Sequence, residues 1–133
     1  MWAAARKEVV MPKGALMFTW GSQVRGREMT AIEVFGETLA YYDGLLKQNR
    51  ISGIRTYLAN TGDLSSLAGV LIIEGELDQL QAILLEPETG RFVMKAEPVV
   101  DHFTIQIMTG GSPEDLQETI GAYVDVIGSL GLS

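Results

Sequence analysis

The sequence predicts an α+β fold: one four-stranded antiparallel sheet with helices on one face and an extra helix at the C-terminus. Three observations predict it. The 133 residues suit one domain. Of these residues, 47% are apolar and 20% charged, as in globular proteins. The apolar segments follow the order strand, helix, strand, strand, helix, strand, helix. We expect residues 15–133 to form this domain and residues 1–14 to be a flexible leader.

Four segments predict the strands. Residues 15–22 and 67–75 are apolar almost throughout, which is typical of strands covered on both faces. Residues 51–60 and 102–109 carry more polar side chains, and the second of these segments alternates cleanly. In the sheet order 4-1-3-2 the first and third strands are central. The most apolar segments would therefore take the most covered positions.

The longest periodic segment, residues 27–49, predicts a helix. Its main apolar stripe, which lies on one helical face, comprises Met29, Ile32, Phe35, Leu39, Tyr42 and Leu46. A second stripe comprises Val34, Thr38, Tyr41 and Leu45. Gly36, Ala40 and Gly44 form a ridge of small residues, which predicts close packing against another helix.

Three shorter helices follow. One is expected from Glu76 to just before Pro87, and residues 90–97 are expected to add another helical turn or two. The last helix has the strongest local signal, because Ser112 is a good N-cap and Pro113 suits the first helical position. We expect this helix to run to about Leu130.

Composition argues against several classes of function. A net charge of −7 disfavours nucleic-acid binding, which needs a basic surface. The chain has no cysteine, one histidine and no acidic cluster with ligand spacing, so we expect no metal site and no cofactor. It also has neither a signal-peptide pattern nor an apolar run of membrane-spanning length. We therefore expect a cytoplasmic protein that does not bind membranes.

One face of the predicted sheet has no helices to cover it. Met17 or its neighbours, Val70 or Leu71, and one side of the fourth strand would project apolar groups there. Monomers rarely leave such a patch in water. We therefore expect a homodimer in which the sheets of two copies face each other.

Two segments, residues 25–42 (RGREMTAIEVFGETLAYY) and 95–103 (KAEPVVDHF), together with the element order, resemble the dimeric α+β barrel superfamily of ferredoxin-like proteins. The second segment looks like the helix-to-strand junction of small bacterial members of unknown function. The resemblance covers roughly residues 15–109 and implies a βαββαβ fold and a homodimer. That superfamily includes cofactor-independent monooxygenases, haem enzymes and small-ligand binding domains, so the fold does not choose among them.

His102 and Arg55 are the candidate catalytic residues. An imidazole suits proton transfer near neutral pH, so His102 would act as a general base. Arg55 would stabilise negative charge that develops in the reaction. Two other interpretations stay open. His102 would be a hydrogen-bonded residue at a strand end, and Arg55 an ordinary cross-strand partner of Glu74.

The candidate ligand-binding residues are Trp20, Arg27, Tyr57 and Gln106. Trp20 would cover an apolar ligand, or else serve core or dimer packing. Arg27, at a helix start, would clamp a carboxylate, or else lie in solvent. Tyr57 shares a strand face with Arg55, and Gln106 shares one with His102, so these polar groups would project into one pocket.

The sequence therefore leaves three functions open. The first is a homodimeric protein that binds a small apolar or acidic molecule between helix and sheet. The second is a cofactor-independent oxygenase or isomerase with His102 as its base. The third is an interaction protein without a ligand pocket. Whether the protein is an enzyme stays undecided at this point.

Overall fold

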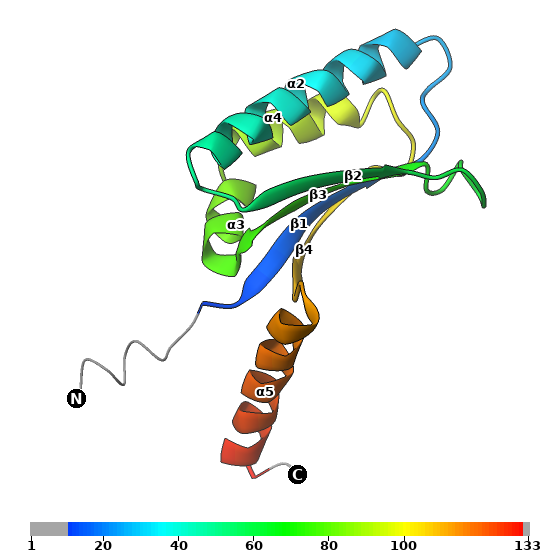
Figure 1. Ribbon diagram of the computed structural model, residues 1–133. Helices are drawn as coiled ribbons and strands as arrows, with labels where there is room; N and C mark the ends of the chain where they lie inside the picture. Colours follow the sequence, from blue (N-terminus) through cyan, green and yellow to red (C-terminus); the bar gives the residue numbers. More distant parts are fainter. Residues whose placement is uncertain (1–10, 132–133) are drawn as a thin grey trace.

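The computed structural model describes residues 11–131, and its centre is a four-stranded sheet (Figure 1). The elements, in chain order, are β1 (Lys13–Trp20), α2 (Glu28–Lys47), β2 (Gly53–Leu58), β3 (Gly69–Glu76), α3 (Leu77–Leu84), α4 (Pro87–Ala96), β4 (Thr104–Thr109) and α5 (Pro113–Ser129). Most of the expected leader lies outside the described residues, and β1 begins within that leader, at Lys13.

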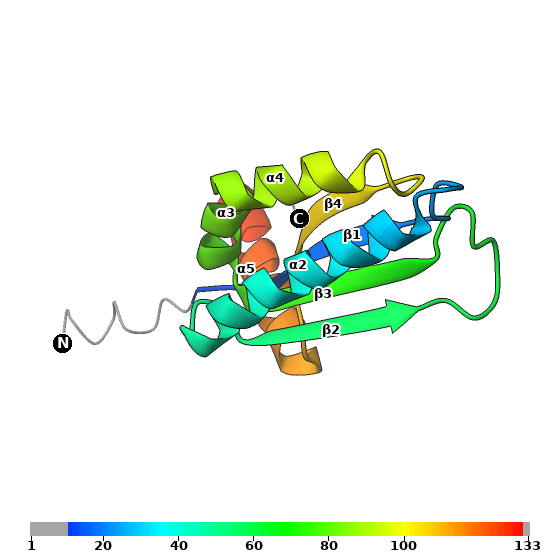
Figure 2. The ribbon, with the colours of Figure 1, turned by 90° about the horizontal axis from the view of Figure 1, so that it is seen from above.

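The sheet has the strand order β2-β3-β1-β4, with every neighbouring pair antiparallel. This is the predicted order 4-1-3-2 read from the other edge, so the predicted topology is confirmed. Figure 2 shows α2 and α4 running across one face of this sheet. The central strands β1 and β3 bury every second residue, whereas β2 and β4 form the edges and are more exposed.

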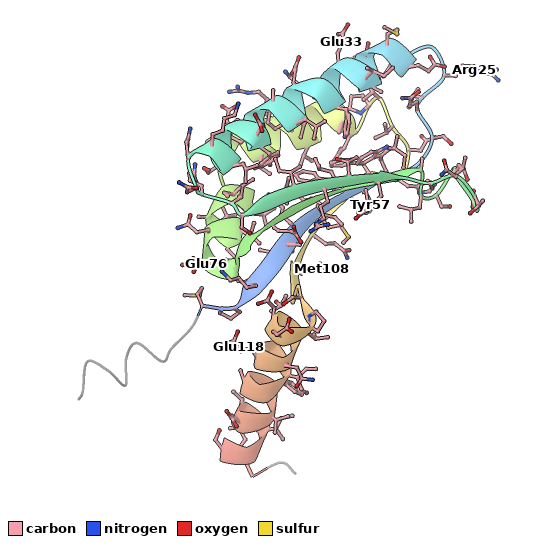
Figure 3. The ribbon with its side chains drawn as sticks, in the orientation of Figure 1. Arg25, Glu33, Tyr57, Glu76, Met108 and Glu118 are labelled. Atoms are coloured by element: carbon pink, nitrogen blue, oxygen red, sulfur yellow. The ribbon has the colours of Figure 1, made fainter. Side chains whose placement is uncertain are left out.

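Strict alternation separates the two faces of the sheet. Leu16 and Phe18 of β1, with Leu71 and Ile73 of β3, are buried under the helices. Leu71 therefore does not belong to the bare face, for which it was one alternative. The side away from the helices, called the open face below, is lined by Ala15, Met17, Thr19, Arg55, Tyr57, Val70, Ile72, Glu74, Thr104, Gln106 and Met108 (Figure 3).

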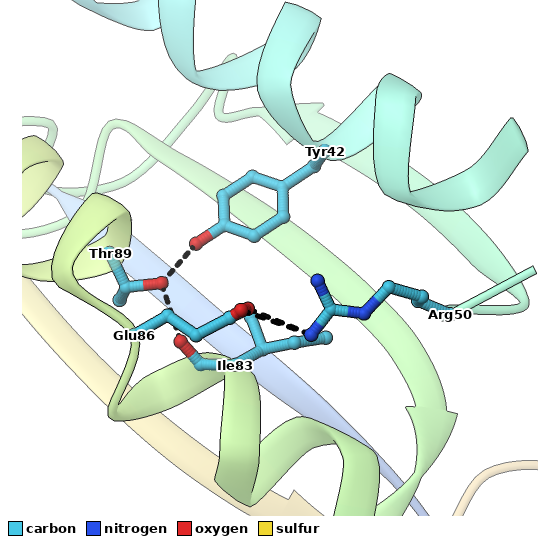
Figure 4. Close-up of polar contacts among 5 residues, drawn as sticks. All are labelled: Tyr42, Arg50, Ile83, Glu86 and Thr89. Atoms are coloured by element: carbon cyan, nitrogen blue, oxygen red, sulfur yellow. Dashed lines mark hydrogen bonds and ion pairs between the residues drawn. The ribbon is translucent and has the colours of Figure 1, made fainter. Parts of the chain in front are cut away.

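The helical layer is organised around Tyr42 of α2, which is 0% exposed. Its ring lies 5.7 Å from that of Phe18 on β1 and 6.3 Å from that of Phe92 on α4. The Thr89 hydroxyl donates to the Ile83 carbonyl oxygen at 2.7 Å. The Tyr42 hydroxyl therefore donates to Thr89 Oγ1, at 2.9 Å (Figure 4). Tyr42 thus joins α2, α4 and the sheet through one buried side chain.

An ion pair closes the same end of the layer. Arg50, just after α2, donates from Nη2 to both carboxylate oxygens of Glu86, at 2.8 and 3.0 Å. Glu86 is the residue before α4, so this contact fixes the α3–α4 junction beneath the end of α2. Both side chains are partly shielded from solvent, which reduces screening of the pair.

The packing of α2 differs from the sequence prediction in two respects. Burial follows Ala31, Val34, Thr38, Tyr42 and Leu45, a line close to the second predicted stripe. Met29 and Ile32, from the main predicted stripe, are 70% and 54% exposed. Within residues 11–131, the ridge of small residues also packs against no helix, because a Cβ added at Gly36 or Gly44 would meet nothing within 4 Å.

Two element boundaries also differ from the prediction. α4 begins at Pro87, three residues before the predicted turn, because Glu86 is extended and proline suits the first position of a helix. β4 begins at Thr104 because His102 has a φ of 53°, which interrupts the extended strand. The predicted cap of α5 is confirmed, with Ser112 and Asp115 forming a reciprocal capping box.

Removing the Thr89 hydroxyl should destabilise the fold. In Thr89→Val the buried Tyr42 hydroxyl loses its acceptor, and we expect the free energy of unfolding to fall by about 1–3 kcal/mol. Thr56→Val, at an exposed position of β2, is the matched control and should change it by less than about 0.5 kcal/mol. Urea denaturation measures both, and equal effects would contradict the role given to Thr89.

Alkaline pH should unfold the protein partly through Tyr42. Burial raises the pKa of Tyr42 from 10.0 to about 12. Because the folded-state pKa is the higher one, its contribution is complete below pH 10 and is lost between pH 10 and 12. The loss is about 3 kcal/mol, at about 1.4 kcal/mol per pKa unit.

Denaturation at several pH values would check this expectation. Tyr42→Phe should flatten the alkaline decline. Some slope should remain, because burial also raises the pKa of Tyr41. Thr56→Val, at an exposed position of β2, is the control and should keep the wild-type slope. A Tyr42→Phe slope as steep as that of the wild type would contradict the assignment.

Candidate functional site

A cavity of about 220 Å³ lies between the helices and the sheet. Its helical side comes from the first half of α2, the second half of α4 and the segment that follows α4. Its sheet side comes from β1 and β3, near the end of the sheet where Trp20 lies. The cavity is therefore at the place where the sequence predicts a pocket, between helix and sheet.

The lining of this cavity is almost entirely apolar. It consists of Phe18, Trp20, Gln23, Ala31, Ile32, Val34, Phe35, Thr38, Leu58, Leu71, Phe92, Ala96, Val99, Val100 and Phe103. Two of these carry a polar side chain, Gln23 and Thr38, and the Thr38 hydroxyl already donates to the Val34 carbonyl oxygen at 2.7 Å. None of the lining residues titrates, so proton transfer would have no side-chain donor or acceptor within this part of the described structure.

Trp20 is the one predicted site residue that lines the cavity. Its ring lies 5.5 Å from that of Phe35 on α2, and its cross-strand partner is Gly69. A Cβ built on Gly69 would come within 2.5 Å of the indole atom Cζ2. Glycine is therefore needed at position 69, because the indole lies directly against the backbone of β3.

Arg27 lies outside the cavity, at the N-cap of α2. Its Nη1 donates to the Pro98 carbonyl oxygen at 2.9 Å, which ties the start of α2 to the segment after α4. A shallow surface depression that Arg27 shares with Glu33 and Lys95 lies on the outside of this junction. Arg27 thus holds the two walls of the cavity together and does not face its interior.

Arg55, Tyr57 and Gln106 all lie on the open face, on the other side of the sheet from the cavity. Arg55 Nε donates to Glu74 Oε1 at 3.2 Å, as the cross-strand interpretation predicts, and this hydrogen bond raises the pKa of Arg55. Gln106 is on the opposite edge strand, so β3 and β1 separate it from Arg55 and Tyr57 by about 14 Å. The expected convergence of these groups on one pocket was wrong.

His102 does not share a strand face with Gln106, which corrects that prediction. It lies two residues before β4, is exposed, and has the left-handed φ of 53°. This turn breaks the alternation on which the prediction depended. His102 is not among the cavity-lining residues, and its role as a base stays a prediction.

The cavity residues that sequence reasoning missed are mainly small ones beside aromatic ones. Ala31, Ala96 and Val99 leave the space that Phe35 and Phe92 border. Alternation of small and large residues across facing helices is a signal for such a space, but it depends on knowing which helices face each other. Gly69, which lies against Trp20, is the one local signal in the sequence. A glycine in an apolar strand indicates that another group approaches the backbone closely.

Residues 11–131 contain no group of three or more His, Cys, Asp or Glu side chains that could hold a metal ion. In the same residues, every helix is too short or too polar to cross a lipid bilayer.

Comparison with known proteins shows the fold. A dimeric protein of unknown function with a ferredoxin-like fold, from Bacteroides fragilis, is 13% identical, with a TM-score of 0.52 over 71% of this chain and 93% of that chain. SnoaB, a cofactor-independent oxygenase from Streptomyces nogalater, is 16% identical, with a TM-score of 0.50 over 76% of this chain and 95% of that chain.

Comparisons by sequence give no match. No protein-family model matches the chain, and no curated protein does. The structural likenesses agree with the strand order β2-β3-β1-β4 and with helices on one face of an antiparallel sheet. The chain therefore has the ferredoxin-like fold.

Proposed function

We propose that this protein binds a small apolar molecule in the cavity between α2, α4 and the sheet. The observation that carries the proposal is the lining, which is apolar except for Gln23 and Thr38 and has no charged group. A dry engineered cavity of about 150 Å³ with a similar lining binds benzene. A cavity of about 220 Å³ has room for a somewhat larger ring system.

The same lining favours an apolar ligand over an acidic one. A buried carboxylate needs a paired cation or several hydrogen-bond donors. The nearest candidate, Arg27, is outside the cavity and donates to Pro98. The Gln23 amide can pair with one hydroxyl or carbonyl group, so a ring with a single polar substituent fits best.

Self-association is part of this proposal. The open face presents Met17, Val70 and Ile72 from the central strands, and nothing in the described chain covers it. The ferredoxin-like protein from Bacteroides fragilis is dimeric, which supports the same state here. We therefore propose a homodimer joined through the open faces. The cytoplasmic location expected from the sequence stays a prediction.

Naphthalene is a suitable probe of the cavity, because it matches the size and polarity of the lining. Titrated into the Trp2→Phe variant, in which Trp20 is the remaining tryptophan, it should change the fluorescence and saturate. Ala96→Leu places a larger side chain in the cavity and should weaken binding at least tenfold. Ala40→Leu, at an exposed position of α2, should leave the affinity unchanged. A filled variant that binds as tightly as the wild type would overturn the proposal.

A second candidate function, cofactor-independent oxygenation of a molecule that reaches His102 outside the cavity, is favoured by the likeness to SnoaB. Binding alone predicts no dioxygen uptake when the protein is mixed with 1-naphthol in air. If the wild type consumes dioxygen and His102→Asn does not, the proposed function is oxygenation, with His102 as the base. Simple binding would then be rejected as the function. Asparagine is chosen because it adopts the positive φ of position 102 at low cost.

A further inference from the structure

Helix α5 projects from the domain on the side of the open face and buries none of its residues (Figure 1). It follows β4 directly through Gly110 and Gly111, and its first turn is fixed by the capping box of Ser112 and Asp115. It makes no substantial contact with another element of residues 11–131. A helix of 17 residues without tertiary packing is only marginally stable in water.

Most of the large apolar residues of α5 and its C-cap lie on one side of the helix, and Val126 lies outside this group. At 100° per residue, six of them fall within an arc of about 120°, called the α5 arc below. The arc comprises Leu116, Ile120, Tyr123, Val124, Ile127 and Leu130, and five of these six are among the exposed large hydrophobic residues. The acidic residues Glu114, Glu118 and Asp125 lie on the opposite side. This is the pattern of a helix that packs against a partner.

The open face has the matching character. Its apolar side chains are Ala15, Met17, Tyr57, Val70, Ile72 and Met108. Tyr57 and Met108 are 56% and 43% exposed. The charges of Arg55 and Glu74 on this face already pair with each other. In Figure 1, α5 continues from the end of β4 on the side of the sheet away from α2 and α4, which is the side of the open face.

We propose that a second copy of this chain covers the open face, and that α5 is an arm whose apolar arc packs against that copy. This inference rests on the proposed self-association and extends it to a segment beyond the sheet. In a two-fold pair each copy supplies one open face and one arm, so the contact is self-complementary.

The available area fits a stable dimer. The α5 arc and the open face together hold twelve apolar side chains per copy. We take each side chain to lose about 60 Å² of accessible surface on association. At about 25 cal/mol per Å², this is about 1.5 kcal/mol, the lower end of the range for burying a large apolar side chain. Twenty-four side chains then give about 1,400 Å², within the usual range of about 1,200–2,000 Å² for specific interfaces. The open face without the arms would supply only about half of this.

The charge pattern also suits a second copy of this chain. Each chain carries a net charge of −7, so two copies repel each other unless their acids are kept apart. The acids of α5 lie on the side away from the arc, where they stay in water when the arc is buried. An acidic or basic partner would find few unpaired charges to bind on either surface, because Arg55 and Glu74 are already paired.

Light scattering during size exclusion, over a range of protein concentrations, tests the arm. The wild type should be a dimer. Ile120→Glu places a charge in the α5 arc and should give a monomer, whereas Ala122→Glu, on the opposite side of the same helix, should leave the dimer intact. Naphthalene binding by Ile120→Glu should persist, which shows that the domain is folded. A dimeric Ile120→Glu would overturn the arm but leave the proposed self-association standing. A monomeric wild type would overturn both.

Cross-linking identifies what the arm contacts. The chain has no cysteine, so Tyr123→Cys carries a single benzophenone label on the exposed arc. Mixed with ¹⁵N-labelled wild type and irradiated, it should form cross-links between labelled and unlabelled chains. The same label on Ala122→Cys should form few. Cross-links confined to one chain would show that α5 folds onto its own domain, and would overturn the inference.

Discussion

The helical layer depends on the packing around Tyr42. This one side chain contacts Phe18 on the sheet and Phe92 on α4, and its hydroxyl bonds to Thr89. Burying a hydroxyl is unfavourable unless it finds a partner, so the bond to Thr89 fixes the position of α4 relative to α2. Aromatic packing alone would tolerate sliding between the two helices, whereas this hydrogen bond tolerates little.

The location of the cavity follows from that constraint. At the Tyr42 end, large aromatic rings and the Arg50–Glu86 pair close the space between α2 and α4. At the other end, Ala31 and Ala96 face each other with short side chains, while the Arg27 contact with Pro98 keeps the helices joined. The helices are therefore held at both ends, and the space between them remains because the residues there are small.

The strand order and the roles of β1 and β3 could be predicted from the sequence, because an apolar run must be covered wherever it lies. The site could be predicted only in part. Trp20 was found because it ends a buried strand, but Arg55, Tyr57 and Gln106 were assigned to the wrong side of the sheet. Alternation shows that two residues share a face but not which face the helices cover. His102 was wrongly assigned to the fourth strand, because the neighbouring residues do not indicate the positive φ that it adopts.

The close contact between Trp20 and Gly69 has a consequence for how ligand size could change in evolution. Any side chain at position 69 would displace the indole toward α2, since a Cβ there already meets the ring. The volume available to a ligand thus depends on Gly69, which is not itself one of the residues that line the cavity. A single substitution of this glycine would thus change the shape of the cavity by moving the indole, although Gly69 itself does not line it.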